Sequence, residues 1–250
     1  MSHFISIVIP TLNEGAYIGR LLESLRRQTY TNFEVIVVDG GSRDETVKIA
    51  REYKVKTIVM PGYGEFSSRN LGAKYARGDI LLFTGSDVRF PENFLEELNK
   101  EFIKNREVVA VFGPHIPEGA PLVGRLEYYV YNCLRFIFSI LPKPLKRFST
   151  SANFIAVRKN IFEKLEGFPP NDINADGIFG QKLVRVGNVK FCLRTYIFAS
   201  ARRMRKMGFL RFNAHYLYVL ENFFPFLSKT RLIKNFKKRS KMVHRKIHEI

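Results

Sequence analysis

Acidic and small polar residues follow three apolar segments in the first half of the chain. Segment 5–9 leads into Pro10-Thr11-Leu12-Asn13-Glu14, segment 35–38 into Asp39-Gly40-Gly41-Ser42, and segment 80–83 into Thr84-Gly85-Ser86-Asp87. Asp and Gly after a strand are ordinary turn residues, but turn chemistry alone does not readily explain three such loops. If the segments are parallel strands, these loops gather at the sheet edge where ligands of open α/β sheets bind.

The segments that must position these loops alternate between strand and helix patterns. Strands are expected at 5–9, 35–38, 57–60, 80–83 and 108–112, which are short and show little polar alternation. Apolar residues recur at helical spacing between them. The pattern predicts an α/β fold, a mostly parallel central sheet flanked by helices. Further strands (153–157, 189–193) and helices (159–165, 176–186) are expected in a less regular second half, and we predict a helical, basic elaboration at the C-terminus.

Composition excludes several classes of protein. The 250 residues are 46% hydrophobic with 23 Phe and 11 Tyr, which is too apolar for a disordered chain. The two cysteines, Cys133 and Cys192, exclude a disulfide framework and a zinc knuckle, and no secretory leader opens the sequence. We therefore expect an intracellular protein. The apolar runs 128–142 and 208–227 are interrupted by polar and charged residues, so neither is a clean membrane span.

Five ordered blocks carry a resemblance to a known family. VIPTLNE, VIVVDGGSRDET, SSRNLGAKYARGD, LLFTGSDVRFPENF and SANFIAVRKNIFEKLEGF resemble glycosyltransferase family 2. The resemblance implies a GT-A (Rossmann-like) fold and inverting transfer of a sugar from a nucleotide-diphosphate sugar to an acceptor hydroxyl. It implies a GT-A domain over 1–207, with a donor half (1–113) and an acceptor half (114–207). An amphipathic and polybasic extension follows at 208–250.

The resemblance also implies a nucleotide site. The loop residues Pro10, Thr11, Leu12 and Glu14 would pack on the nucleotide, together with Ser86, and Asp39 would hydrogen-bond the base. Arg69 would lie near the diphosphate, which suits a guanidinium with its fork of donors. The alternative for Arg69 is an ordinary surface charge on a helix. Asp39 fits uracil and guanine alike, so the donor is expected to be a UDP- or GDP-sugar.

The metal motif departs from the family pattern. The family usually has Asp-x-Asp after the fourth strand, where this chain has Gly85-Ser86-Asp87. The retained carboxylate, Asp87, is the expected ligand of Mg²⁺ or Mn²⁺, a hard cation that prefers oxygen ligands. Asp87 could instead be a helix N-cap before Pro91.

The resemblance assigns the remaining chemistry to the second half. Asp176 would be the base that takes the acceptor proton, although the preceding acidic position of the family is Ala175 here. The alternatives are that Asp176 only caps a helix, or that Asp172 is the base. Arg202 and Arg203 would hold the diphosphate leaving group, or they would form a solvated basic face.

Charge is concentrated at the C-terminus. Residues 200–250 hold 14 basic and 2 acidic side chains, or +12 of the net +18. The segment 122–141 is apolar nearly all round and is followed by Lys143, Lys146 and Arg147, so it is either a buried helix or an interfacial one. No nucleic-acid recognition motif accompanies the charge. We therefore expect an anionic membrane surface rather than nucleic acid, a lipid-linked acceptor, and a cytoplasmic protein peripheral to the inner face of the membrane.

Other classes of protein with alternating strands and helices fit the sequence less well. A nicotinamide dehydrogenase would show G-x-G-x-x-G after the first strand, and that motif is absent. A sugar nucleotidyltransferase stays open as an alternative, although its glycine-rich, basic opening loop is replaced by IPTLNE. A non-catalytic module that binds anionic lipid or nucleic acid also stays open, but it would leave Asp39, Asp87 and Asp176 without a role.

Overall fold

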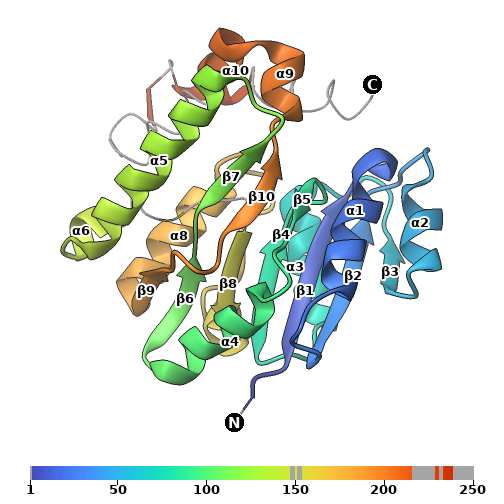
Figure 1. The fold of residues 1–250 in the computed structure, drawn as a ribbon, viewed down its shortest axis with the longest axis horizontal. Helices are drawn as coiled ribbons and strands as arrows, with labels where there is room; N and C mark the ends of the chain where they lie inside the picture. The colour runs from blue at the N-terminus through green and yellow to red at the C-terminus, as the bar shows by residue number, and fades with distance from the viewer. Residues whose placement is uncertain (1, 147–149, 151–153, 216–228, 231–232, 239–250) are drawn as a thin grey trace.

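A seven-stranded sheet forms the centre of the computed structural model, which describes residues 2–146, 150, 154–215, 229–230 and 233–238 (Figure 1). Its strand order is β3-β2-β1-β4-β8-β6-β9. The first four of these strands run parallel, β8 is antiparallel to both of its neighbours, and β9 is parallel to β6. The predicted mostly parallel sheet is confirmed. The strands are β1 (Ile5–Thr11), β2 (Phe33–Asp39), β3 (Lys56–Val59), β4 (Ile80–Thr84), β6 (Val108–Phe112), β8 (Phe154–Arg158) and β9 (Asn188–Phe191).

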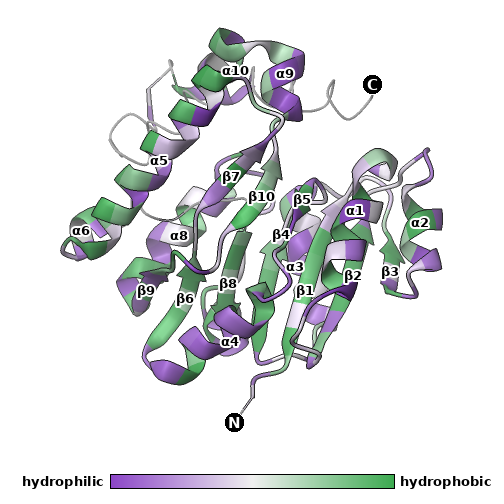
Figure 2. Cartoon of the chain, viewed as in Figure 1, coloured by the Kyte–Doolittle hydropathy of each residue, from purple (hydrophilic) through white to green (hydrophobic). Residues whose placement is uncertain are grey.

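Helices cover both faces of this sheet because its strands are apolar on both sides. In β1, Ile7 points into the core under α1 and α4, whereas Val8 points into the core under α3 and α8. Both residues are fully buried, as expected for a strand between two helical layers. Figure 2 shows that the central strands are largely hydrophobic. The helices are α1 (Gly15–Arg26), α2 (Thr46–Glu52), α3 (Glu65–Tyr75), α4 (Phe94–Lys104), α5 (Leu122–Ile140), α6 (Lys143–Lys146), α7 (Lys159–Lys164), α8 (Ala175–Val186), α9 (Arg202–Met207) and α10 (Phe209–His215).

A second, three-stranded sheet connects the C-terminal part to the end of β4. It contains β5 (Val88–Arg89), β10 (Ile197–Ser200) and β7 (His115–Glu118), with β10 in the middle. The Ser200 amide donates to the Asp87 carbonyl at 3.0 Å, so this sheet sets the start of α9 beside Asp87. None of these three strands is predicted from the sequence, because β5 has two residues and the four-residue strands β7 and β10 are only partly buried.

Local polar contacts set where α2 begins. The helix starts at Thr46, after a turn in which Ser42 binds Asp39 through both its amide and its hydroxyl. Asp44 then accepts hydrogen bonds from the Thr46 amide and from Gly15 at the start of α1. The loop that follows β2 is thereby fastened to the loop that follows β1. In the described part of the chain, no helix is both long enough and apolar enough to cross a bilayer.

Candidate active site

Asp39 is buried at the carboxyl end of β2 and is held by four hydrogen bonds. Oδ1 accepts from the amides of Gly41 (2.9 Å) and Ser42 (2.7 Å), and Oδ2 accepts from the hydroxyls of Thr11 (2.9 Å) and Ser42 (2.5 Å). Gly41 has a φ of 101°, a left-handed conformation that favours glycine and lets the loop wrap around the carboxylate. The side chain is therefore fixed in one orientation.

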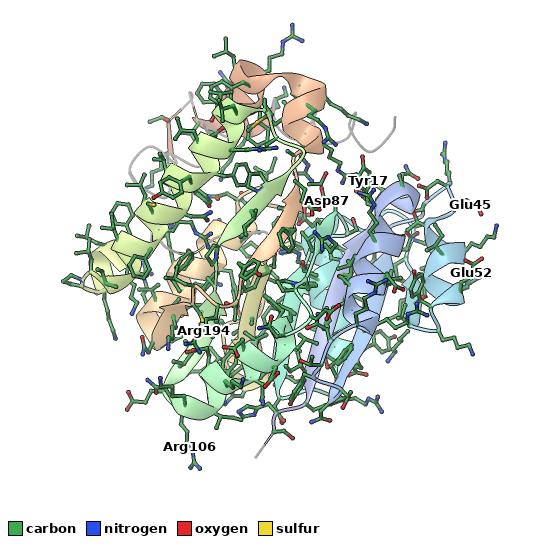
Figure 3. All side chains as sticks on the ribbon, viewed as in Figure 1. Tyr17, Glu45, Glu52, Asp87, Arg106 and Arg194 are labelled. Atoms are coloured by element: carbon green, nitrogen blue, oxygen red, sulfur yellow. The ribbon has the colours of Figure 1, made fainter. Side chains whose placement is uncertain are left out.

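Arg202 joins the end of β1 to the end of β4. Its Nη2 lies 2.6 Å from Glu14 Oε1, its Nε lies 2.9 Å from Asp87 Oδ2, and its Cζ lies 4.2 Å from the centroid of the Tyr17 ring. Burial alone would lower the pKa of Arg202, but Glu14 and Asp87 raise it overall, so the guanidinium is charged. Figure 3 shows Asp87 and Tyr17 at the same edge of the molecule. One buried cation thus lies between two carboxylates.

The other residues predicted for the nucleotide loop lie around these groups. Pro10 pairs in register with Val38 of β2, and Leu12 contacts the loop after β2 near Gly40. Ser86 is buried in the turn after β4, and Arg203 follows Arg202 in the first turn of α9 and is half-buried. Both arginines lie in one helix, but the contacts with Glu14 and Asp87 are made by Arg202.

Arg69 is almost completely buried on α3, which excludes the alternative of a solvated surface charge. It is 1% exposed, and its Cζ lies 5.3 Å from the Phe66 ring centroid and 5.7 Å from that of Phe168. Its Nη2 pairs with Glu65 Oε1 at 2.8 Å. Its Nε and Nη1 have no hydrogen-bond partner among the described residues. A buried guanidinium with unused donors is suited to bind an anion.

Asp176 lies in the first turn of α8 and is close enough to Arg69 to feel its charge. Burial raises the pKa of Asp176 to about 6, while the Arg69 guanidinium opposes this by favouring the carboxylate. The side chain is half-buried and keeps some access to solvent. The residue at the N-cap of α8 is Asn174, and the Asp176 carboxylate lies near the first-turn amides of its own residue and of Gly177.

Asp172, the alternative candidate for the base, makes an ion pair and a hydrogen bond. Its carboxylate pairs with Lys237 Nζ at 3.0 and 3.1 Å and accepts from the Asn174 amide at 2.9 Å. Asp172 is therefore held by an ion pair and a backbone amide, whereas no ion pair is found for Asp176 among the described residues.

The contacts around the predicted site residues form two sets at the carboxyl edge of the sheet. One holds Asp39, the loop after β1, Asp87 and Arg202, and the other holds Arg69 and Asp176. The loop before α3 connects them, because Met60 and Gly62 donate to the carbonyls of Asp39 and Gly40. Tyr17 and Glu65 are not among the residues predicted from the sequence. The i,i+4 spacing of Glu65 and Arg69 would have indicated their pair, whereas nothing local indicated that Tyr17 lies under Arg202.

Asp87 meets part of what a divalent cation requires. Its carboxylate is a hard oxygen ligand with a side chain 21% exposed, and Arg202 occupies one of its oxygens. Among the described residues, no cluster of three His, Cys, Asp or Glu side chains could hold a metal ion. In the part of the chain that the structure describes, Asp87 is thus the one predicted site residue here that would give a divalent cation a carboxylate ligand.

The sequence profile of Glycosyl transferase family 2 matches residues 6–166, which include β1 to β4, β8 and the loops around Asp39 and Asp87. The chain belongs to glycosyltransferase family 2. The resemblance stated from the sequence is thereby confirmed, as is the prediction of a transferase. This membership also decides against the nucleotidyltransferase and the non-catalytic module.

Two related glycosyltransferases agree with this family assignment. The O-antigen chain rhamnosyltransferase RfbN of Salmonella typhimurium is 27% identical over 219 residues, which are 83% of this chain and 70% of the rhamnosyltransferase. The poly(ribitol-phosphate) β-N-acetylglucosaminyltransferase TarS of Staphylococcus aureus is 36% identical over 108 residues, 40% of this chain and 18% of TarS.

Two solved structures share the fold. The mannosyltransferase PcManGT of Pyrobaculum calidifontis, in complex with GDP-Man and Mn²⁺, has a TM-score of 0.71 at 19% identity. TarS residues 1–349, in complex with UDP-GlcNAc, gives 0.64 at 23% identity. The matches cover 92% and 79% of this family 2 chain, but 66% and 58% of those two chains. The GT-A architecture is confirmed.

Proposed function

We propose that this family 2 enzyme transfers a sugar, with inversion, from a nucleotide-diphosphate sugar to an acceptor hydroxyl. The observation that carries the proposal is that the carboxyl of Asp176 lies near the buried cation Arg69 at the ligand-binding edge of the sheet, in surroundings that raise its pKa to about 6. A base with a pKa close to neutral pH is well matched to proton abstraction from an alcohol.

The donor would be bound by the loops after β1 and β2 and by Arg69. Asp39 would accept a hydrogen bond from a ring N–H of uracil or guanine, which requires it to exchange one of its present donors. The unused donors of Arg69 would bind diphosphate oxygens. UDP-GlcNAc and GDP-Man in the solved relatives support both classes of donor.

A divalent cation would be held by Asp87 and by the donor diphosphate. It would neutralise diphosphate charge as the leaving group departs. Mn²⁺ in the complexes of PcManGT and of a mycobacterial glucosyl-3-phosphoglycerate synthase supports this assignment. Arg202, already 2.9 Å from Asp87, would add its own positive charge on the protein side of the leaving group, with Arg203 next to it.

The transfer step needs one proton acceptor and one stabilised leaving group. Asp176 would take the proton of the acceptor hydroxyl while the oxygen forms a bond to the anomeric carbon. The bond between that carbon and the diphosphate oxygen would break, and the nucleoside diphosphate would leave with the electron pair. Attack opposite to the leaving group inverts the configuration at the anomeric carbon.

A panel of UDP- and GDP-sugars with Mn²⁺ or Mg²⁺ tests the donor. A bound donor should raise the melting temperature of the wild type, and the increase should fall when EDTA removes the cation. Asp87→Asn should weaken the cation-dependent part of the increase, whereas Glu107→Gln, on an exposed turn away from the site, should not. If no nucleotide sugar changes the melting temperature, the proposal is wrong.

We also propose a lipid-linked acceptor at an anionic membrane, with the basic C-terminal segment contributing to attachment. Its charge of +12 supports this. Much of that segment lies outside the described residues. Deleting it would also remove Ile233, which is fully buried, and the Lys237–Asp172 pair. Replacing the exposed Lys229, Lys234 and Lys238 by Gln is the better test, and unchanged flotation with anionic vesicles would reject the role of these charges.

A further inference from the structure

Helix α5 presents its apolar residues to solvent. Its outward face contains Leu122, Leu126, Tyr129, Ile137 and Ile140, which are 84%, 61%, 68%, 48% and 70% exposed. Val123, Val130, Tyr131, Leu134 and Phe136 are also exposed, and Arg125 is the one charged residue among the exposed positions of this helix. Contiguous apolar surface of this kind marks an interaction site in a protein that otherwise buries such residues.

Two polar side chains in the middle of α5, those of Asn132 and Arg135, bind the protein instead. Asn132 exchanges two hydrogen bonds with the backbone of His115, and Arg135, 1% exposed, donates to the Gly113 carbonyl at 3.1 Å. The Arg135 guanidinium also lies over the rings of Tyr131 and Phe191. These contacts fix the rotation of the helix about its axis. The exposed apolar face is therefore built into the fold.

Basic residues lie at both ends of this face. Lys143 of α6 is exposed just after its C-terminal end. At the other end, α9 packs Met204 against Gly124 of α5 and carries the exposed Arg205 and Lys206. In Figure 2, α5 lies at the margin of the molecule, with α6 and α9 near its two ends. An apolar stripe with cationic ends suits the headgroup region of an anionic bilayer.

The charge of the molecule decides between a bilayer and a second copy of the chain. Two copies that met through α5 would bring together proteins of net charge +18, with basic residues at both ends of the contact. An anionic surface has the opposite sign. The length of the face, about 27 Å along the helix axis, lets it lie in the plane of the interface.

We infer that α5 is a membrane-docking helix, whose outward face enters the interfacial region of an anionic lipid bilayer. The helix lies along the surface, with its buried polar face still packed on the protein. The inference rests on the exposure and charge of α5 and does not depend on glycosyl transfer.

The absence of tryptophan from the chain allows a direct test. Tyr129→Trp places a single fluorophore on the outward face of α5, and Tyr75→Trp places one on α3, where Tyr75 is 48% exposed. With vesicles of phosphatidylcholine and phosphatidylglycerol, the emission of the first variant should shift to the blue and be quenched by brominated lipid. Emission of the second should stay unchanged. No shift at 129, or equal shifts at both positions, would overturn the inference.

A second pair of variants keeps the test independent of the probe. Leu126→Glu combined with Ile137→Glu should lower the fraction bound to the same vesicles about tenfold or more, because each carboxylate must be drawn into the interface. Ile103→Glu on α4, where Ile103 is 44% exposed, adds a charge elsewhere and should bind nearly as well as the wild type. Without lipid, sedimentation should show that the wild type and all variants are monomers. If the wild type were a dimer and the double variant a monomer, the partner of α5 would instead be a second copy of the chain.

Discussion

The loops at the carboxyl edge of the central sheet and helix α5 distribute their polar residues in opposite ways. At the sheet edge, buried charged groups are fixed by polar partners on an apolar scaffold: hydroxyls and amides hold Asp39, and two carboxylates hold Arg202. In α5, Asn132 and Arg135 attach the helix to the protein, and many of the apolar residues are exposed. The first arrangement prepares a site for a small anionic ligand, and the second prepares a surface for an extended apolar one.

The largest expected effect concerns the sheet edge. Asp176→Asn should lower kcat about a thousandfold, because a neutral amide cannot accept the acceptor proton. It should do so with any acceptor, soluble or lipid-linked. In the wild type, log kcat/KM should rise with pH up to about 6, where Asp176 loses its proton, and level off above. Asp172→Asn is the matched control and should retain the acidic limb. If Asp172→Asn removed that limb instead, the base would be assigned to the wrong residue.

Arg202 should give the next largest effect. Arg202→Ala should reduce kcat about a hundredfold and change donor affinity less. The reason is that the positive charge of Arg202 stabilises the negative charge that develops on the diphosphate as it leaves. The variant also leaves Glu14 and Asp87 without their shared cation, so the melting temperature must be measured beside the kinetics. Arg202→Lys keeps the positive charge but lacks the branched guanidinium, so its kcat should lie between those of the wild type and Arg202→Ala. Loss of donor affinity with unchanged kcat would contradict the proposed role.

Arg69 should mainly affect donor binding. Arg69→Ala should weaken donor binding about ten- to a hundredfold, because two charge-assisted hydrogen bonds are lost. It should also move the acidic limb of the pH profile upwards, since the Arg69 charge holds the pKa of Asp176 down. Arg77→Ala, which removes a largely exposed arginine paired with Glu34, is the control and should alter neither quantity. Calorimetric titration with donor, and kcat/KM against pH, measure the two effects separately.

The sequence predicts the central sheet edge well and α5 only in part. The strands of the central sheet are apolar on both faces, so β1 and β4 are recognisable from a few residues, and the loops after them follow. Contacts such as Glu14–Arg202 join residues 188 positions apart, which no local pattern indicates. In α5, apolar residues occur on both faces, and the pattern could not tell which face the fold would cover. That choice depends on the hydrogen bonds of Asn132 with His115 on β7 and of Arg135 with Gly113, which follows β6.

The raised pKa of Asp176 also predicts a gain in stability when the residue is replaced. Its folded-state pKa is about 6, against 3.8 for an ordinary Asp, so the folded form loses stability as pH rises from 3.8 to 6. Asp176→Asn should therefore stabilise the protein at pH 7.5 by about 1 to 3 kcal/mol, the lower part of the range reflecting partial exposure. The gain should shrink towards pH 4. Urea unfolding at the two pH values measures it, and a variant that is less stable at pH 7.5 would contradict the burial of this charge.

The smallest expected effect compares one substitution on two helices. Leu98 of α4 is fully buried between the sheet and its neighbours, so Leu98→Ala should destabilise the protein by about 2 to 5 kcal/mol. Leu126 of α5 is 61% exposed, so Leu126→Ala should change the free energy of unfolding by less than about 0.5 kcal/mol. Urea denaturation in lipid-free buffer measures both. A loss at Leu126 comparable to that at Leu98 would mean that the face of α5 is already covered in solution, and that its apolar residues serve the fold in the same way as those of the core.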